Sequence, residues 1–178
     1  MRKVVAYELL SLDGVAEHPD EFVTEFDEVM QEHIRHVISS QDTVLLGRRT
    51  HDDWAGFWPT SDDEPFASFI NGVDKFVATS TLPRQAWPNT TVIEGDLHQF
   101  VTTLKQQSGD DIGVHGSISL VQSLLEVGLV DELRLVITPT LVMHDRRLFD
   151  KGLSTRLTLT RHIVSPAGYL LLDFRVGR

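Results

Sequence analysis

The sequence predicts an α/β protein built on a mostly parallel sheet with helices on both faces. Short runs rich in Val, Leu and Ile alternate with segments of helical periodicity along most of the chain. Most of these runs end in Gly, Ser, Thr or Asp, which is typical of turns that follow buried strands. The last two apolar runs are separated by residues 166–168 (Pro-Ala-Gly), which predicts an antiparallel hairpin at the C-terminal edge of the sheet.

The first half of the chain is expected to form three strands and two helices. The strands are predicted at residues 3–10, 43–46 and 74–78, because each is a short apolar run closed by turn residues. Apolar residues recur at helical spacing from Phe22 to Ile38, which predicts a helix over that whole range. A shorter helix is expected at residues 48–55, followed by an acidic loop at residues 56–64.

The second half repeats the alternation of strands and helices. Strands are predicted at residues 91–93, 111–114, 132–138, 157–164 and 169–176. Asp96 and Ser117 are typical N-terminal caps, so helices are expected at residues 97–107 and 118–127. Gly128 then ends the second of these helices.

Composition indicates one globular domain over residues 1–178 and excludes several classes of site. The chain has 16 Lys and Arg against 26 Asp and Glu, a net charge of −10, which argues against nucleic acid or a membrane surface as partner. It has no Cys, which excludes disulfides, thiolate nucleophiles and Cys-ligated metal sites, and no metal site is expected. With no targeting segment and no apolar run of membrane length, we expect a cytoplasmic protein.

Four polar loops follow predicted strands, and in open parallel sheets ligands bind beyond the carboxyl ends of the strands. The loops are residues 11–14 (Ser-Leu-Asp-Gly), 47–50 (Gly-Arg-Arg-Thr), 79–81 (Thr-Ser-Thr) and 113–117 (Gly-Val-His-Gly-Ser). Each loop alone also fits a plain turn. Together they offer hydroxyl, guanidinium and backbone N–H groups to one extended molecule with several phosphates.

The second and fourth loops carry most of this prediction. Arg48 and Arg49 locally reverse the acidic charge at a predicted helix start, and guanidinium groups suit phosphate. Residues 113–117 lead from a strand through glycine into a helix, whose free N–H groups and positive dipole end suit a pyrophosphate. The pattern is not GxGxxG, so it does not predict a Rossmann dinucleotide motif.

These loops belong to a longer series of segments that occur in a fixed order. The series comprises residues 11–14, 45–50 (Leu-Leu-Gly-Arg-Arg-Thr), 75–82 (Lys-Phe-Val-Ala-Thr-Ser-Thr-Leu), 114–117 (Val-His-Gly-Ser), 128–133 (Gly-Leu-Val-Asp-Glu-Leu), Pro139 and 148–149 (Leu-Phe). Through them the chain resembles the C-terminal reductase domain of the riboflavin-biosynthesis bifunctional deaminase–reductase. The resemblance covers nearly the whole chain and implies a dihydrofolate-reductase-like, three-layer fold.

The resemblance also implies an oxidoreductase that uses NADPH. The cofactor-binding residues that it implies are Ala6, Leu12, Gly14, Gly47, Arg48, Arg49, Thr50, Thr79, Ser80, His115, Gly116, Ser117 and Ile118. Within this set, the arginines would hold phosphates and Thr79 and Ser80 would lie near the adenosine 2′-phosphate. The residue types are consistent with NADPH, since a 2′-phosphate is bound by Arg, whereas NAD sites use a carboxylate that binds the ribose 2′-hydroxyl. Asp13, beside the nicotinamide, is expected to orient the substrate or relay a proton.

The substrate side is where the chain departs from the family. Members often carry a Gly-x-Gly-like loop where this chain has residues 143–147 (Met-His-Asp-Arg-Arg). Arg146 and Arg147 are expected either to bind a substrate phosphate or to be solvated. Trp54 is expected either to wall a flat substrate ring or to lie in the core. His115 stands where members often have a glycine, so its side chain is expected to narrow the pyrophosphate turn or to donate to it.

The function expected from the resemblance is that of a stand-alone 5-amino-6-(5-phosphoribosylamino)uracil reductase. The zinc site of the deaminase half requires Cys, which this chain lacks. Resemblance further implies a small-molecule substrate and a homodimer. Three alternatives stay open: a dihydrofolate or pterin reductase, a non-catalytic NADPH-binding module, and an interaction protein that keeps only the fold. The pterin alternative needs a buried carboxylate on the first helix, where Glu25, Asp27 and Glu28 are available.

Overall fold

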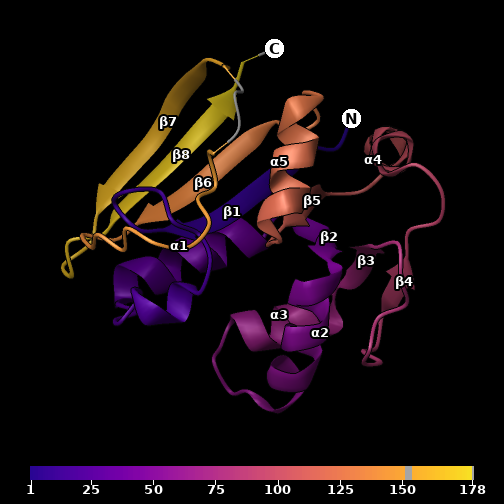
Figure 1. Cartoon of the computed structure of the whole chain (residues 1–178), viewed down its shortest axis with the longest axis horizontal. Coiled ribbons are helices and arrows are strands. Elements are labelled where there is room, and N and C mark those ends of the chain that lie inside the picture. The colour runs from indigo at the N-terminus through magenta and orange to yellow at the C-terminus, as the bar shows by residue number, and fades with distance from the viewer. Residues whose placement is uncertain (151–153, 178) are drawn as a thin grey trace.

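The computed structural model describes residues 1–150 and 154–177 and contains an eight-stranded sheet in the order β4-β3-β2-β5-β1-β6-β8-β7 (Figure 1). The strands are β1 (Val4–Leu10), β2 (Gln41–Gly47), β3 (Asp74–Ala78), β4 (Thr90–Val92), β5 (Asp111–Val114), β6 (Glu132–Ile137), β7 (Leu157–Val164) and β8 (Leu170–Val176). Strands β1 to β6 pair in parallel, whereas β8 is antiparallel to β6 and β7. The predicted mostly parallel sheet with an antiparallel C-terminal hairpin is therefore confirmed.

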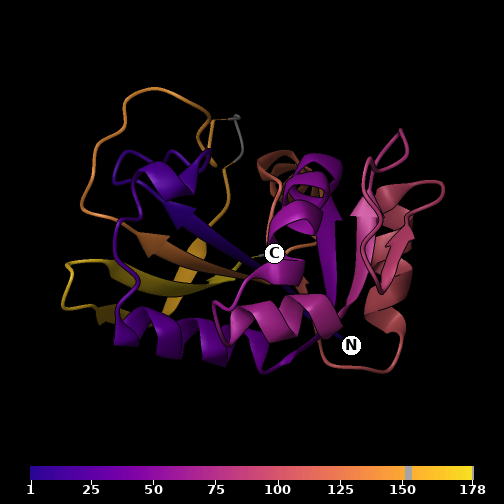
Figure 2. The same ribbon diagram turned by 90° about the horizontal axis from the view of Figure 1, so that it is seen from below.

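Helices cover both faces of the sheet. They are α1 (Glu28–Ile38), α2 (Arg48–Phe57), α3 (Phe66–Gly72), α4 (Leu97–Gln106) and α5 (Ile118–Glu126), with short 3-10 turns at Pro19–Glu21 and Trp58–Thr60. Apolar side chains of α4 and α5 share one core cluster, and those of α1, α2 and α3 lie in two others. Figure 2 shows α1 and α3 running along one face, and Figure 1 shows α5 on the other.

Strand β1 shows why both faces must be covered. Its alternate residues Val4, Ala6 and Leu10 lie in the core cluster of α4 and α5, whereas Tyr7 lies in the cluster of α1. Successive side chains of a strand point to opposite faces, so a central parallel strand needs apolar partners on both sides. This burial explains the nearly continuous apolar run in the sequence.

The first helix is shorter than its periodicity predicts. It begins at Glu28 rather than at Phe22, because Asp27 is an extended N-cap whose carboxylate accepts the Met30 N–H at 2.9 Å. The same carboxylate accepts the Ala167 N–H from the C-terminal hairpin at 3.2 Å. The helical prediction for residues 22–27 is therefore wrong, because a tertiary contact and a cap outweigh the local spacing.

A second difference lies between α2 and β3. Helix α2 runs through Phe57, beyond the predicted end at Ala55, and α3 occupies a stretch for which no helix was predicted. Helix α3 has only seven residues, which is less than the two or three turns over which helical periodicity becomes visible. Its burial of Ala67 and Ile70 against the sheet supplies the stability that the short helix lacks by itself.

A buried polar pair lies beside β5 on the α1 side of the sheet. His115 Nε2 lies 2.8 Å from Oε1 of Gln41, and the ring packs against Tyr7, Phe66 and Phe69. A Cβ on the neighbouring Gly113 would lie 2.1 Å from the same Gln41 oxygen. Glycine at this position therefore makes room for the Gln41–His115 hydrogen bond.

We predict that Gly113→Ala lowers the free energy of unfolding by about 1–3 kcal/mol, the usual cost of overpacking a core. Gly72→Ala is the matched control, because a Cβ there meets nothing within 4 Å. The control is expected to stay within about 0.5 kcal/mol of the wild type. Urea denaturation of both variants measures the difference, and equal stabilities would contradict the role assigned to Gly113.

Burial of His115 predicts a defined acid sensitivity. Desolvation lowers the pKa of His115 from 6.5 to about 3, so the unfolded chain binds one more proton than the folded chain between these values. The free energy of unfolding contributed by this residue is fully present above pH 6.5 and is lost as the pH falls toward 3.

The stability difference between the wild type and His115→Gln should therefore shrink by about 2 kcal/mol as the pH is lowered from about 6.5 to about 5. Urea denaturation at both pH values measures it. Taking a difference between two proteins removes the contributions of all other titrating groups, which both proteins share. A difference that does not change with pH would show that His115 titrates normally in the folded state.

Candidate functional site

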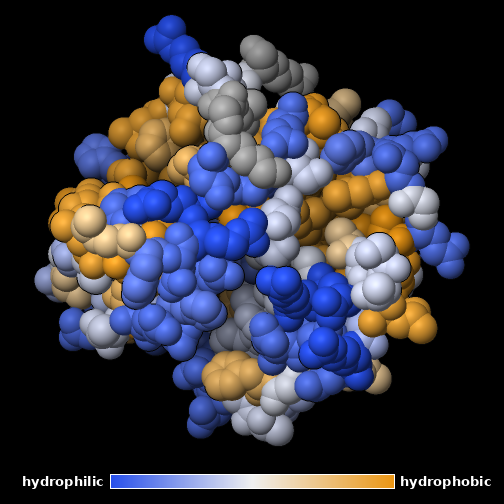
Figure 3. Space-filling model, in the orientation of Figure 1, coloured by the Kyte–Doolittle hydropathy of each residue, from blue (hydrophilic) through white to orange (hydrophobic). Residues whose placement is uncertain are grey.

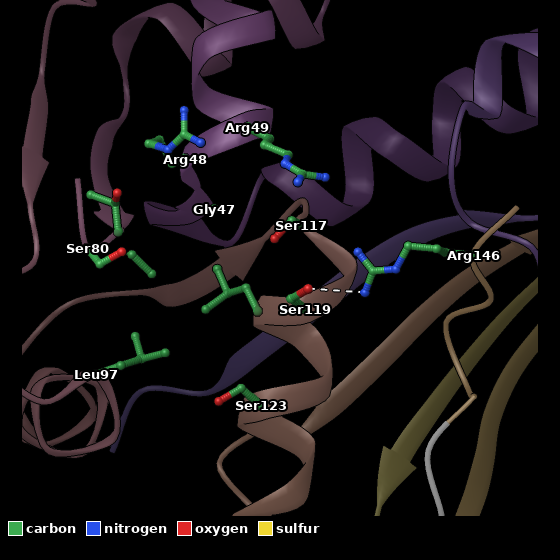
Figure 4. A pocket seen from close by; sticks show the side chains of 12 residues that line it. Gly47, Arg48, Arg49, Ser80, Leu97, Ser117, Ser119, Ser123 and Arg146 are labelled. Atoms are coloured by element: carbon green, nitrogen blue, oxygen red, sulfur yellow. Dashed lines mark hydrogen bonds between the residues drawn. The ribbon is translucent and has the colours of Figure 1, made fainter. Parts of the chain in front are cut away.

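A pocket of about 440 Å³ lies where β2 and β3 end and α5 begins (Figure 4). It is lined by Gly47, Arg48, Arg49, Ala78, Thr79, Ser80, Leu97, Ser117, Ser119, Leu120, Ser123 and Arg146. These residues come from five segments of the chain. Parallel pairing of β2 with β3 and with β5 brings three of these segments, those that follow the three strands, to one edge of the sheet. Figure 3 shows strongly hydrophilic residues gathered near the middle of this side of the molecule.

The floor of the pocket is a close contact between two backbone segments. Gly47 N–H donates to the Gly116 carbonyl at 3.2 Å, and a Cβ on Gly47 would lie 2.3 Å from Oγ of Ser117. Gly116 has a φ of 108° and would bring a Cβ to 3.1 Å from Oγ1 of Thr50. Glycine is therefore required at both positions. Gly47 leaves space for Ser117, and Gly116 leaves space for Thr50 and adopts a positive φ that other residues rarely adopt.

The N-terminus of α5 lies at the pocket, next to this contact. Ser117 occupies the N-cap position, but its side chain makes no capping hydrogen bond, and the peptide between Gly116 and Ser117 is cis. The first N–H groups of a helix have no partner within the helix and carry the positive end of its dipole. An anion in the pocket would meet these groups together with the Ser117 hydroxyl.

Three guanidinium groups face the same pocket. Arg48 Nη1 is held 2.8 Å from Asp52 Oδ2, and Arg146 Nη2 donates to Oγ of Ser119 at 3.1 Å. Arg49 is exposed and makes no ion pair with any residue that the structure describes. Figure 4 shows Arg48 on the side of Ser80, and Arg49 on the side of Ser117 and Arg146. Three cations around one hollow in a chain of net charge −10 point to an anionic ligand.

The hydroxyl groups after β3 complete the wall nearest Arg48. Thr79 closes its own turn, because its Oγ1 donates to the Thr81 carbonyl and accepts the Thr81 N–H. Ser80 lies beside it on the pocket wall with its hydroxyl drawn toward the cavity (Figure 4). The predicted grouping of Arg48, Thr79 and Ser80 is thus present in space.

Asp13 lies outside this pocket and acts as a clamp between two loops. Its carboxylate accepts the N–H groups of Val142 and Met143 at 3.0 and 3.1 Å, the Ser11 hydroxyl at 2.8 Å and Arg147 Nη2 at 3.1 Å. The Val142 N–H, followed by the Ser11 and Met143 bonds, holds the pKa of Asp13 well below its usual range. An acid this strong has no proton to give at neutral pH, so the geometry favours an orienting role over a proton relay.

Arg146 and Arg147, neighbours in the loop at residues 143–147, have separate environments. Arg146 reaches the pocket, whereas Arg147 is held by Asp13 through both its Nε and its Nη2. Both arginines were expected as substrate ligands, but their side chains contact different residues. Trp54, the other expected substrate residue, packs edge-on against Trp58 and Phe66 in an aromatic cluster outside the pocket lining.

The remaining expected cofactor residues are not among those that line the pocket. Ala6 and Ile118 are buried in the core, and Thr50 packs under Gly116. Leu12 and Gly14 lie on the loop clamped by Asp13. The ring of His115 is buried with Gln41 on the opposite face of the sheet. The expected narrowing of the turn by that side chain, or donation from it, is therefore wrong, since the strand alternation turns it away from the pocket.

Sequence reasoning missed several residues that the structure brings to the site. Ser119 and Ser123 line the pocket one helical turn apart on α5, and their four-residue spacing was the available signal. Outside the pocket lining, sequence reasoning also missed Glu8, a lone carboxyl group within the apolar run of β1. It is buried, and desolvation raises its pKa to about 8, so it is mostly uncharged at neutral pH.

The sheet order and the pocket at its carboxyl edge define a dihydrofolate-reductase-like α/β protein. A family model described as the RibD C-terminal domain matches residues 2–171. The chain therefore belongs to the RibD C-terminal domain family.

Sequence relatives and solved structures agree with this membership. The Bacillus subtilis (strain 168) protein YyaP is 30% identical over 112 residues, which span 61% of this chain and 59% of YyaP. A candidate riboflavin biosynthesis protein from Shewanella sp. PV-4 has a similar structure, with a TM-score of 0.77 and 16% identity over 99% of both chains.

A further similar structure is longer than this chain. It is the diaminohydroxyphosphoribosylaminopyrimidine deaminase/5-amino-6-(5-phosphoribosylamino)uracil reductase from Thermotoga maritima, with a TM-score of 0.68 and 14% identity. The match covers 99% of this chain but 57% of that one. At these identities the structural likeness establishes the shared fold. Separately, no helix in the described part of this chain combines the length and the hydrophobicity needed to cross a membrane.

The contact between Gly47 and Ser117 gives a direct test of the pocket floor. We predict that Gly47→Ala lowers the free energy of unfolding by about 1–3 kcal/mol, because the added methyl group overlaps Ser117. Ser117→Gly removes the two side-chain atoms that this methyl meets, at 2.3 and 2.9 Å. The double variant should therefore be more stable than the sum of the single effects predicts, by about 1 kcal/mol or more in a double-mutant cycle. Strict additivity would show that the two positions do not touch.

Proposed function

We propose that this protein is an NADPH-dependent reductase that transfers a hydride to a small polar substrate. Family membership and fold support a reductase-like function related to riboflavin biosynthesis. The observation that carries the NADPH proposal is the convergence of Arg48, Arg49 and Arg146 with the start of α5 around one pocket. A dinucleotide with a 2′-phosphate has separated anionic groups, and the pocket offers separated cations.

The pocket suits the two phosphate positions of NADPH differently. Arg48 with Thr79 and Ser80 would hold the adenosine 2′-phosphate, because guanidinium and hydroxyl groups gather there. Arg49 and the start of α5 at Ser117 would hold the pyrophosphate above the glycine contact, where backbone can approach closely. When bound, the cofactor supplies the hydride, and the chain supplies orientation and exclusion of water.

For the substrate, we propose a compound similar to 5-amino-6-(5-phosphoribosylamino)uracil, the compound named for the Thermotoga maritima relative. The ionised Asp13 and Arg147, fixed to each other at the loop edge, would orient its polar groups. We further propose a cytoplasmic protein and a homodimer. The edge strand β7 supports the dimer, since it exposes Leu159 and Val164.

The structure weighs against the pterin alternative in its expected form. Glu25 and Glu28 are exposed, and Asp27 is occupied as the N-cap of α1. None of the three supplies a buried free carboxylate on the first helix. A non-catalytic NADPH-binding module stays the second candidate, and one observation favours it. Asp13 and Arg147, the charged groups nearest the expected substrate end, already satisfy each other.

The test is calorimetric titration of the wild type, Arg48→Ala and Arg49→Ala with NADPH and with NADH. Loss of a charged hydrogen bond to phosphate should weaken binding by about 10- to 100-fold. Arg48→Ala should weaken NADPH binding far more than NADH binding, because NADH lacks the 2′-phosphate. Arg49→Ala should weaken both, because both carry the pyrophosphate.

Arg35→Ala is the matched control, since Arg35 is exposed on α1 and pairs with Glu32. It should bind both nucleotides like the wild type. Equal losses for NADPH and NADH in Arg48→Ala would refute the position proposed for the 2′-phosphate. A folded wild type that binds neither nucleotide would remove the reductase proposal altogether.

A further inference from the structure

Glu8 in β1 is a buried carboxyl group with an oxygen that is left unpaired by the described part of the chain. Glu8 is 8% exposed, and its Oε1 is buried without a hydrogen bond to any residue that the structure describes. A buried polar group without a partner costs free energy that an apolar side chain of similar size would not. Such a group within a packed cluster suggests that a ligand completes its hydrogen bonds.

The position of Glu8 along β1 relates it to the pocket. It alternates with Ala6 and Leu10, so it lies on the face covered by α5, which is also the face that carries the pocket. Strand β5 ends at Val114, which pairs with Ala6. Glu8 lies two residues beyond Ala6 on β1, toward the edge where β5 ends and the turn at Gly116 follows.

On the other side of β1, Glu8 pairs with Leu135 of β6. Above this part of the sheet, the core cluster is completed by Ala16 and Leu148, which belong to loops rather than to a helix. These two loops are joined to each other, because Ala16 N–H donates to the Arg146 carbonyl at 3.0 Å and Leu148 N–H donates to the Gly14 carbonyl at 3.0 Å. These joined loops include Arg146, whose guanidinium lines the pocket.

We propose that the buried carboxyl group of Glu8 binds the carboxamide of the nicotinamide ring. A neutral carboxyl group presents one O–H donor and one carbonyl acceptor, and a carboxamide presents one carbonyl acceptor and N–H donors. The two groups can thus form a pair of hydrogen bonds in which every buried polar atom gains a partner. This inference rests on the proposed function, since it assigns the nicotinamide end of the same NADPH molecule.

The geometry assigns the direction of the cofactor as well. With the phosphates at Arg48, Arg49 and the start of α5, the nicotinamide end would continue past Gly116 toward Glu8. The hydrogen bond from Arg146 to Ser119 joins the loop to α5 at the pocket (Figure 4). The nicotinamide would lie under the loops that Asp13 clamps, where water is excluded.

The experiment compares two ligands and three proteins by calorimetry. The ligands are NADPH and 2′-phosphoadenosine 5′-diphosphoribose, which keeps all phosphates but lacks the nicotinamide. The proteins are the wild type, Glu8→Leu and Glu8→Gln. Glu8→Leu should weaken NADPH binding by about 10-fold or more, because the paired hydrogen bonds are lost. It should bind the truncated ligand like the wild type. Glu8→Gln should restore NADPH binding to within about threefold, because an amide also offers one donor and one acceptor.

A vibrational measurement gives a second readout that needs no turnover. Infrared difference spectra of the wild type at pH 7 should contain the C=O stretch of a protonated carboxyl group that is absent from Glu8→Gln. Addition of NADPH should shift this band, and addition of the truncated ligand should leave it unchanged. If Glu8→Leu does not fold, Glu8→Gln and this band still decide the question.

The outcomes separate the two proposals. If the wild type binds neither ligand, the proposed function and this inference both fall. If it binds both ligands but Glu8→Leu loses neither, or if NADPH leaves the carboxyl band unmoved, Glu8 has no part in binding and only this inference is overturned. Equal weakening of both ligands in Glu8→Leu would also overturn it, because the effect would then be structural.

Discussion

The contact between the backbone at Gly47 and the turn at Gly116 is the constraint on which the candidate site depends. Strands β2 and β5 are parallel neighbours, and their pairing from Val44 to Leu45 carries both chains to the same edge. There, two loops meet so closely that a single Cβ on Gly47 would overlap Ser117. Because side chains are excluded at this point, the start of α5 lies directly beside the arginines that follow β2.

Three arginines lie around this contact in a protein whose net charge is negative. Each of the three arginines is held differently: Arg48 by Asp52, Arg146 by Ser119, and Arg49 without an ion pair in the described chain. Anchored guanidinium groups lose less rotamer freedom when an anion binds, so the partial ordering of Arg48 and Arg146 favours recognition over mere attraction. Charge that is local and anchored can coexist with a net charge of −10.

Two carboxyl groups close together in the sequence show how strongly environment decides ionisation. Asp13 sits among N–H donors and Arg147, which keep it charged and make it a clamp between loops. Glu8 sits among apolar side chains, and burial keeps it mostly protonated at neutral pH. Strand β1 thus contains a mostly neutral carboxyl group, that of Glu8, and the loop after it contains a charged one, that of Asp13. Loops joined by Asp13 cover the region where Glu8 is proposed to bind.

The sequence by itself determined the class of fold and most of the residues of the candidate anion-binding pocket. Apolar runs with turn residues marked the strands, and loops after consecutive strands identified residues 47–50, 79–81 and 116–117, because strand polarity alone brings such loops to one edge. Only the tertiary structure decided the start of α1, the direction of His115, the separation of Arg146 from Arg147 and the isolation of Glu8. Each of these depends on which face of the sheet a side chain meets and on which distant segment covers it there. The spacing of residues along the sequence predicts neither the face nor the covering segment. Partners such as Asp27 and Ala167, or Gln41 and His115, lie far apart in the chain.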